Sequence, residues 1–149
     1  PARSERAHLK LSRLADTDPL TGLANRRGLF AALSQRAGLS PSPPRCAILL
    51  ADIDHFKAIN DTYGHDGGDA ALVGFAERLR GVMRKDDLVA RWGGEEFLVV
   101  LDQADATAAA TVAERLRKSA AGQPFTVNGA AVTVTATDPE PIQFIPKPA

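Results

Sequence analysis

The chain has 149 residues, 44% of them hydrophobic and 24% charged, a composition ordinary for one globular domain. Its 18 basic and 18 acidic residues balance, so we expect no nucleic-acid polymer as partner, although a local basic site for one nucleotide stays compatible. No apolar stretch reaches the roughly 18 residues of a membrane span. The lone Cys46 excludes an intrachain disulfide, which fits a cytoplasmic location.

Two helices are predicted before the first strand. The first carries one apolar stripe, formed by Ala7, Leu11 and Leu14. Because the chain starts at Pro1 and not at a methionine, we interpret residues 1–15 as a connector helix from a longer parent protein, a sensor whose cytoplasmic part this would be. Pro19 and Gly22 then break the pattern. The second helix has a core face of Leu29, Phe30 and Leu33, a stop at Gly38 and the loop SPSPP after it.

The middle of the chain alternates apolar runs with glycine-rich polar ones. CAILLADID is predicted to be a buried strand that ends in Asp52 and Asp54. HFKAINDTYGHDGGD then reads as a short helical turn followed by a glycine-rich loop. A helix is predicted from near Asp69, with an apolar face formed by Leu72, Phe75, Leu79 and Val82. DLVARW and FLVVL flank Gly93-Gly94 as the two strands of a hairpin.

The last third of the chain is predicted to hold one more helix and one more hairpin. The helix spans residues 105–121, ends at Gly122 and faces inward with Ala109, Val112, Leu116 and Ala120. Asn128-Gly129 suits the type I′ turn of a hairpin. Residues 138–149 carry four prolines and are interpreted as an extended tail that continues neither a helix nor a central strand. This order of elements predicts an α/β (α+β) sandwich, with a mainly antiparallel central sheet flanked by helices.

Carboxylates stand at two of the predicted strand ends. If the first strand pairs with the Gly-Gly hairpin, Asp52 lies near Glu95 and Glu96. Such a cluster of oxygen atoms suits Mg²⁺, which binds a few carboxylates, water and the phosphates of a substrate. The local spacing supports solvated acids at the strand ends equally well.

Several familiar sites are excluded by spacing. An EF-hand loop would need a glycine at Lys57 and a glutamate at Tyr63. The three histidines are not spaced for zinc. Neither a GxxxxGK(S/T) loop nor a GxGxxG fingerprint occurs, so a nucleotide would be bound by another route.

The stretch NDTYGHDGGD offers the polar groups that a base requires. An amide such as Asn60 and a carboxylate such as Asp69 together match the edge of guanine, and Lys57 is placed to neutralise phosphate. The plainer alternatives are a turn amide for Asn60, a helix N-cap for Asp69 and a loop residue for His65.

Four motifs taken together resemble the GGDEF family of diguanylate cyclases. They are DPLTGLANRR, DIDHFKAINDTYGHDGGD, RKDDLVARWGGEEF and AERLRKSA, in the order and approximate spacing of that family, with GGEEF as the signature variant. On this resemblance, residues 16–137 form the GGDEF domain. The resemblance implies a palm-like fold related to nucleotidyl cyclases. It also implies condensation of two GTP into cyclic di-GMP, with release of two pyrophosphates, by two domains that meet as a homodimer.

The resemblance also implies a role for each matching residue. Asp52, the carbonyl of Ile53 and Glu95 would hold Mg²⁺ (or Mn²⁺), with Glu96 assisting. Glu95 would also be the base for the 3′-hydroxyl. The residues implied to contact substrate are Asn60 and Asp69 at guanine, His65 along the substrate, Lys57 at the phosphates, and Gly93 and Gly94 where the backbone approaches them.

Arg84 and Asp87 form an RxxD motif at the distance from the signature at which the family has a product-binding inhibitory site. Arginine stacks on guanine and forks onto phosphate, and aspartate accepts from the guanine edge. Taken alone, RxxD would indicate an exposed ion pair. At this spacing the resemblance implies feedback inhibition by cyclic di-GMP.

The chain departs from the family after VTVTAT. The family has a serine-isoleucine-glycine strand end there and then a helix with phosphate-gripping lysine and arginine, whereas this chain has DPEPIQFIPKPA. Three readings follow from the sequence. The domain is an active cyclase, or a catalytically weak receptor that binds cyclic di-GMP, or an oligomerisation domain whose acids are solvated.

Overall fold

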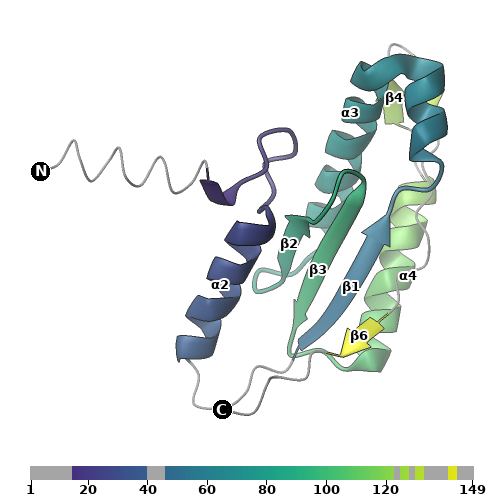
Figure 1. Cartoon of the computed structure of the whole chain (residues 1–149). Helices are drawn as coiled ribbons and strands as arrows, with labels where there is room; N and C mark the ends of the chain where they lie inside the picture. Colours follow the sequence, from purple (N-terminus) through teal and green to yellow (C-terminus); the bar gives the residue numbers. More distant parts are fainter. Residues whose placement is uncertain (1–14, 40–45, 123–124, 128–129, 133–140, 144–149) are drawn as a thin grey trace, which may run out of the picture.

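The computed structural model describes residues 15–39, 46–122, 125–127, 130–132 and 141–143. Within them, helices and strands alternate in nearly the predicted order (Figure 1). The helices are α2 (Arg26–Leu39), α3 (Phe56–Val82) and α4 (Ala106–Gly122). The strands are β1 (Cys46–Asp52), β2 (Leu88–Arg91), β3 (Glu96–Asp102), β4 (Phe125–Val127), β5 (Ala130–Val132) and β6 (Pro141–Gln143).

The central sheet has four antiparallel strands in the order β2-β3-β1-β6. Helix α2 covers one face of this sheet, while α3 and α4 lie on the other (Figure 1). The predicted antiparallel sheet flanked by helices is confirmed. So is the hairpin of β2 and β3, and a second hairpin pairs β4 with β5. Its turn, Asn128-Gly129, lies outside the described residues.

Alternation along the strands divides the core in two. Ala47, Leu49 and Ala51 of β1 are buried toward α3 and α4, together with Phe97, Val99 and Leu101 of β3. The opposite face contributes Ala90 and Val100 to a smaller cluster around Leu29 of α2. Because both faces of the sheet are covered, the interiors of β1 and β3 are apolar on both sides. Their polar residues stand only at the ends of the strands, as Asp52 does in β1 and Glu96 in β3.

Helix α3 corrects the predicted glycine-rich loop. The helix begins at Phe56 and continues to Val82, with a single break at Gly64, where φ is 76° and ψ is 177°. This backbone conformation is open almost only to glycine. Phe56, Ile59 and Tyr63 pack onto the core at helical spacing, which outweighs the low helix propensity of the polar, glycine-rich segment. The segment is therefore two helical arms joined at a kink.

Two details of the helices differ from prediction, and one is confirmed. Phe30 was expected in the core but is 57% exposed, because α2 presents Leu29 to the sheet and turns Phe30 toward the ring of Trp92. Helix α2 also continues one residue past Gly38. The inward face of α4 is confirmed, since Ala109, Leu116 and Ala120 are buried and Val112 packs beside them.

The proline-rich tail contributes a strand that the sequence did not predict. Its residues Pro141–Gln143 pair with β1 at the edge of the sheet. An edge strand tolerates proline at its start, where the missing N–H removes no interior ladder bond. The stripe of Ala7, Leu11 and Leu14 and the loop at residues 40–44 lie outside the described residues. Among the helices that the structure describes, none is both long and apolar enough to cross a bilayer.

Candidate functional site

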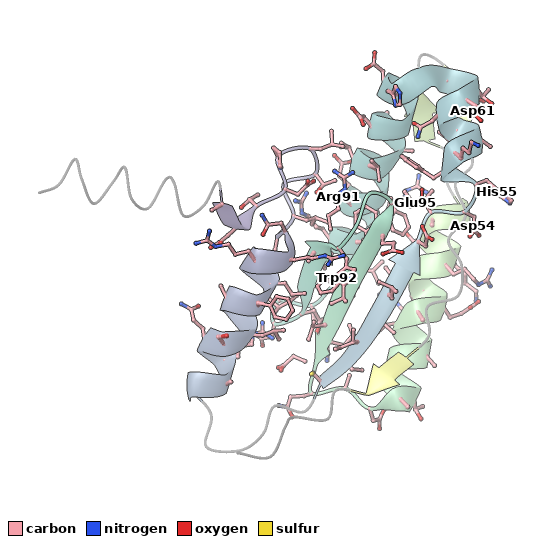
Figure 2. The ribbon with its side chains drawn as sticks, viewed as in Figure 1. Asp54, His55, Asp61, Arg91, Trp92 and Glu95 are labelled. Atoms are coloured by element: carbon pink, nitrogen blue, oxygen red, sulfur yellow. The ribbon has the colours of Figure 1, made fainter. Side chains whose placement is uncertain are left out.

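Three acidic residues, Asp52, Glu95 and Glu96, meet where β1 ends and β3 begins. In the register of the two strands Asp52 pairs with Glu96, and beyond it the Ile53 amide donates to the Glu95 carbonyl at 3.3 Å. Figure 2 shows Glu95 and Asp54 at the same end of the sheet, with His55 directed away from them. The predicted meeting of Asp52 with Glu95 and Glu96 is therefore confirmed as geometry.

The electrostatics of this cluster favour a proton or a cation. Partial burial and the charges of Glu96 and Asp54 raise the pKa of Asp52, although hydrogen bonds with Ile53 and Glu95 offset part of the effect. The pKa of Glu95 is also raised, by partial burial and by the charges of Asp52 and Glu96. The Asp52 Oδ1 atom is buried without a hydrogen-bond partner. A buried carboxylate oxygen without a partner costs free energy until a ligand satisfies it.

These residues fit a divalent cation that keeps much of its water. Asp52 and Glu95 offer carboxylate oxygens, and Ile53, which directly follows Asp52 and pairs with Glu95 through its amide, offers its carbonyl. In the part of the chain that the structure describes, no group of three or more His, Cys, Asp or Glu side chains is placed to hold a metal ion, so these side chains supply only part of a coordination shell. Mg²⁺ suits such a partial set, since it takes one or two carboxylates, with water and substrate phosphates in the other positions.

The signature turn leaves open space beside this cluster. The amides of Trp92 and Gly93 donate to the Glu96 carbonyl at 2.8 and 3.2 Å, which closes the turn between β2 and β3. Neither Gly93 nor Gly94 has a positive φ. A Cβ at Gly94 would meet nothing within 4 Å, whereas one at Gly93 would lie 3.1 Å from Glu96 Oε2. Turn geometry therefore does not require these glycines, and the space above Gly94 is free.

Arg91 holds the turn to the segment before α2. Its guanidinium donates to the Gly94 carbonyl at 2.7 Å and to Asp18 Oδ1 at 3.2 Å. Asp18 in turn accepts from the amide and hydroxyl of Thr21 at 2.9 and 2.7 Å. The Arg91 amide also donates to the Ala24 carbonyl. We call these contacts of Arg91 with Asp18, Ala24 and Gly94 the turn clamp.

Helix α2 contacts the same turn through Arg26. The Arg26 Nε atom donates to the Trp92 carbonyl at 2.7 Å, and its guanidinium carbon lies 4.3 Å from the centre of the Trp92 ring. Figure 2 shows Arg91 and Trp92 on the side of the turn that faces α2. Arg91 and Trp92 thus hold the turn in place. Their partners Asp18 and Arg26 were not predicted, since nothing in their local sequence points to a partner so far along the chain.

The predicted base-reading residues lie on the two arms of α3. Asn60 is half-buried on the first arm, and Asp69 is exposed on the second. A Cβ built at Gly68 would lie 1.8 Å from Asn60 Oδ1, so the amide rests against the residue that precedes Asp69. Asp69 stands inside the second arm, which excludes its alternative reading as a helix N-cap. Asn60 is likewise within a helix and not in a turn. Lys57 and His65 are exposed.

The RxxD motif is more structured than an exposed ion pair. The Asp87 carboxylate is 2% exposed and accepts from the backbone amides of Arg84 and Asp102 at 2.9 and 3.0 Å. Arg84, 62% exposed, donates to both Asp87 oxygens and, at 2.7 Å, to the Asp102 carbonyl. The hydrogen bonds and charge of Asp87 raise the pKa of Arg84. Asp87 thus fixes the turn between α3 and β2 and presents the arginine to solvent.

Arg84 borders an open, basic depression on the surface. The depression contains the cations Arg80, Arg84 and Lys85 and the single acid Asp87. Arg80 is held by donating to the Thr21 carbonyl at 2.9 Å. The residues that line the depression are Gly22, Leu23, Ala24, Arg80, Met83, Arg84, Lys85, Asp87 and Val89.

Two comparisons with sequences place the chain among known proteins. The family model for the diguanylate cyclase GGDEF domain matches residues 15–137. The response regulator PleD of Caulobacter vibrioides is 50% identical over 117 residues, which cover 76% of this chain and 25% of PleD. The diguanylate cyclase DgcP of Pseudomonas aeruginosa is 41% identical over 138 residues, 91% of this chain and 21% of that protein. The chain thus spans a quarter or less of these relatives.

A solved structure has the same architecture. It contains the coiled coil and GGDEF domain of DgcB from Caulobacter crescentus in complex with c-di-GMP, and it aligns with a TM-score of 0.80 at 29% identity. The alignment covers 91% of this chain and 74% of that one. With the family model matching most of the sequence, the chain belongs to the GGDEF domain family of diguanylate cyclases.

Proposed function

We propose that this domain condenses two GTP into cyclic di-GMP and two pyrophosphates, with Mg²⁺ or Mn²⁺ bound at the end of β1. The observation that carries the proposal is the cluster of Asp52, Glu95 and Glu96, which holds an unsatisfied buried carboxylate oxygen beside an open glycine turn. The proposal includes a cytoplasmic location for the domain, because GTP is available there.

The proposed step is an in-line displacement. The 3′-hydroxyl oxygen of one GTP attacks the α-phosphorus of the other, a new P–O bond forms, and the bond to pyrophosphate breaks. Glu95 takes the hydroxyl proton. The second bond forms in the same way with the roles of the two GTP exchanged, so two domains must face each other as a homodimer.

The remaining site residues bind and orient the substrate. Asp52, the Ile53 carbonyl and Glu95 hold the divalent ion, and Glu96 assists from its place opposite Asp52. When bound, the ion supplies neutralisation of phosphate charge. Lys57 adds a positive charge at the phosphates, and the backbone of Gly93 and Gly94 can approach them closely. The guanine base is read by Asn60 and Asp69, with His65 along the substrate.

The test is a product assay on purified protein with GTP and Mg²⁺. We expect mass spectrometry to detect cyclic di-GMP, and pyrophosphate release to fall about 10²–10⁴-fold in Glu95→Gln, as for removal of a general base. Glu77→Gln, an exposed acid on α3 outside the site, is the matched control. A folded, dimer-competent preparation that releases no pyrophosphate would contradict cyclase activity.

A second candidate function is reception of cyclic di-GMP without turnover. It is favoured by the exposed guanidinium of Arg84 at a basic depression, and by a C-terminal sequence, DPEPIQFIPKPA, that departs from the family's phosphate-gripping motif. On this reading Arg84 and Asp87 bind the dinucleotide, which in an active domain would act as a feedback inhibitor. Calorimetric titration tests the binding, because cyclic di-GMP should bind wild type and bind Arg84→Ala at least tenfold more weakly. The product assay then separates the two functions, since a receptor binds the dinucleotide without releasing pyrophosphate from GTP.

A further inference from the structure

Gly68 stands where no side chain fits beside Asn60. A Cβ at this position would lie 1.8 Å from Oδ1 and 2.8 Å from Cγ of Asn60, and 3.2 Å from Cζ of Phe56. The φ of Gly68 is not positive, unlike that of Gly64, so backbone conformation does not require glycine here. The requirement is one of space.

The two arms of α3 are fixed, so the side chain of Asn60 would have to give way. The first arm is anchored by Phe56 and Ile59, which pack on the main core. The second arm is anchored by its buried face, which contains Gly67, Gly68, Ala71, Leu72 and Phe75. An extra methyl group between the arms would therefore rotate the Asn60 amide away before it moved either backbone.

We propose that Gly68 is a positioning residue for base recognition: its missing side chain creates the space in which the Asn60 amide rests, next to the residue that precedes Asp69. This inference rests on the proposed function, in which Asn60 and Asp69 read guanine together. An amide recognises a base edge only when its donor and acceptor stay in hydrogen-bonding geometry. Displacement by the width of a methyl group would break that geometry while leaving the fold intact.

The test measures nucleotide affinity by calorimetry in Mg²⁺, with α,β-methylene GTP as the probe because its α–β linkage cannot be cleaved. We expect Gly68→Ala and Asn60→Ala each to weaken binding about tenfold to a hundredfold, the range for losing a buried hydrogen bond. The double variant should bind no more weakly than Asn60→Ala alone, because both changes remove the same contact. Affinity for the corresponding ATP analogue should not fall.

Gly81→Ala is the matched control, since Gly81 is also in α3 and a Cβ there would meet nothing within 4 Å. Binding by Gly68→Ala at wild-type strength would overturn the inference, as would additive losses in the double variant. If Gly68→Ala melts at a much lower temperature, the steric reading still requires that adding Asn60→Ala restores it. Failure of that rescue also overturns the inference.

A second readout separates this inference from the proposed function. The side-chain amide resonance of Asn60, identified by its loss in Asn60→Ala, should shift in Gly68→Ala and stay in place in Gly81→Ala, without any nucleotide. An unshifted resonance overturns the role of Gly68. If the resonance shifts but wild type binds the guanine and adenine analogues alike, the proposed guanine recognition fails and Gly68 still sets the position of the amide.

Discussion

The Arg91 guanidinium lies 3.2 Å from the Asp18 carboxylate, although 73 residues separate them in the chain. Both side chains are mostly shielded from water, at 20% and 15% exposure. The same guanidinium binds the Gly94 carbonyl, so the segment before α2 and the signature turn are held by one residue. The turn that contributes Glu95 is thus fixed from outside its own hairpin.

Replacing Arg91 with alanine should destabilise the fold by about 1–3 kcal/mol, because the shielded Asp18 carboxylate loses its ion pair and the Gly94 carbonyl loses its donor. Urea unfolding measures the loss. Arg27→Ala is the control, since the ion pair of Arg27 with Asp16 is at the surface, where the Arg27 side chain is 75% exposed. Equal losses in the two variants would show that the turn clamp adds nothing to an ordinary surface pair.

The ion pair should also make stability depend on pH in the acid range. Partial burial raises the pKa of Asp18, but the hydrogen bonds from Thr21 and the charge of Arg91 outweigh it and leave the pKa below the ordinary value of 3.8. This contribution is therefore complete above the unfolded-state pKa and is lost as pH falls through the folded-state pKa. The difference in unfolding free energy between wild type and Asp18→Asn should shrink as pH falls. A constant difference would contradict it.

Asp52→Asn should stabilise the metal-free protein while weakening its affinity for Mg²⁺. The raised pKa of Asp52 and of Glu95 means that their contribution to stability is present below the unfolded-state pKa and is lost as pH rises through the folded-state values. Wild type should therefore melt below Asp52→Asn in chelator at neutral pH, with the gap closing in acid. Added Mg²⁺ should raise the melting temperature of wild type only.

The expected loss of Mg²⁺ affinity in Asp52→Asn is large because Asp52 is proposed to bind the ion directly. Loss of a group that only orients a metal ligand costs about 10–100-fold in affinity, so loss of a ligand should cost at least tenfold. Glu77→Gln, an exposed acid of α3, should leave both the melting temperature in chelator and the response to Mg²⁺ unchanged. Equal Mg²⁺ responses in wild type and Asp52→Asn would count against the metal site.

Variants of Arg84 and Asp87 should show that Arg84 mainly binds ligand and that Asp87 mainly stabilises the fold. Asp87→Ala leaves the backbone amides of Arg84 and Asp102 without their acceptor and should cost about 1–3 kcal/mol in urea unfolding. Arg84→Ala leaves both backbone donors to Asp87 in place and removes a side chain that is 62% exposed, so it should destabilise the fold less than Asp87→Ala does. Both variants should lose affinity for cyclic di-GMP. A destabilised Arg84→Ala with unchanged affinity would reverse these roles.

The strands β1 and β3 were predictable because each is an apolar run with an abrupt polar end, and α4 was predictable because its apolar residues recur at helical spacing. Because both faces of β1 are covered, its residues form an uninterrupted apolar run in the sequence. Its last residue, Asp52, was correctly expected near Glu95 and Glu96. At the start of α3 the sequence predicted a short helical turn, and it predicted a glycine-rich loop where the helix continues through Gly67 and Gly68, because glycine lowers helix propensity. Core packing on both sides of these glycines, by Ile59 before them and Leu72 after them, overrides that propensity.

Phe30 was misplaced for a related reason. Helical periodicity places Leu29, Phe30 and Leu33 near one another on α2, but it does not say how the helix rotates on the sheet. Packing of Leu29 against Ala90 and Val100 sets that rotation and leaves Phe30 beside Trp92 at the surface.

The sequence by itself determined the family, the antiparallel sheet and the acids that meet at its end. Motif order and the pattern of apolar residues can be read from residues that are close together in the chain. Only the tertiary structure decided what holds those residues in place. Arg91 finds Asp18 through the packing of a distant segment, and Gly68 faces Asn60 because one glycine sets the angle between two helical arms. Such contacts depend on how the elements pack, and no local propensity encodes them.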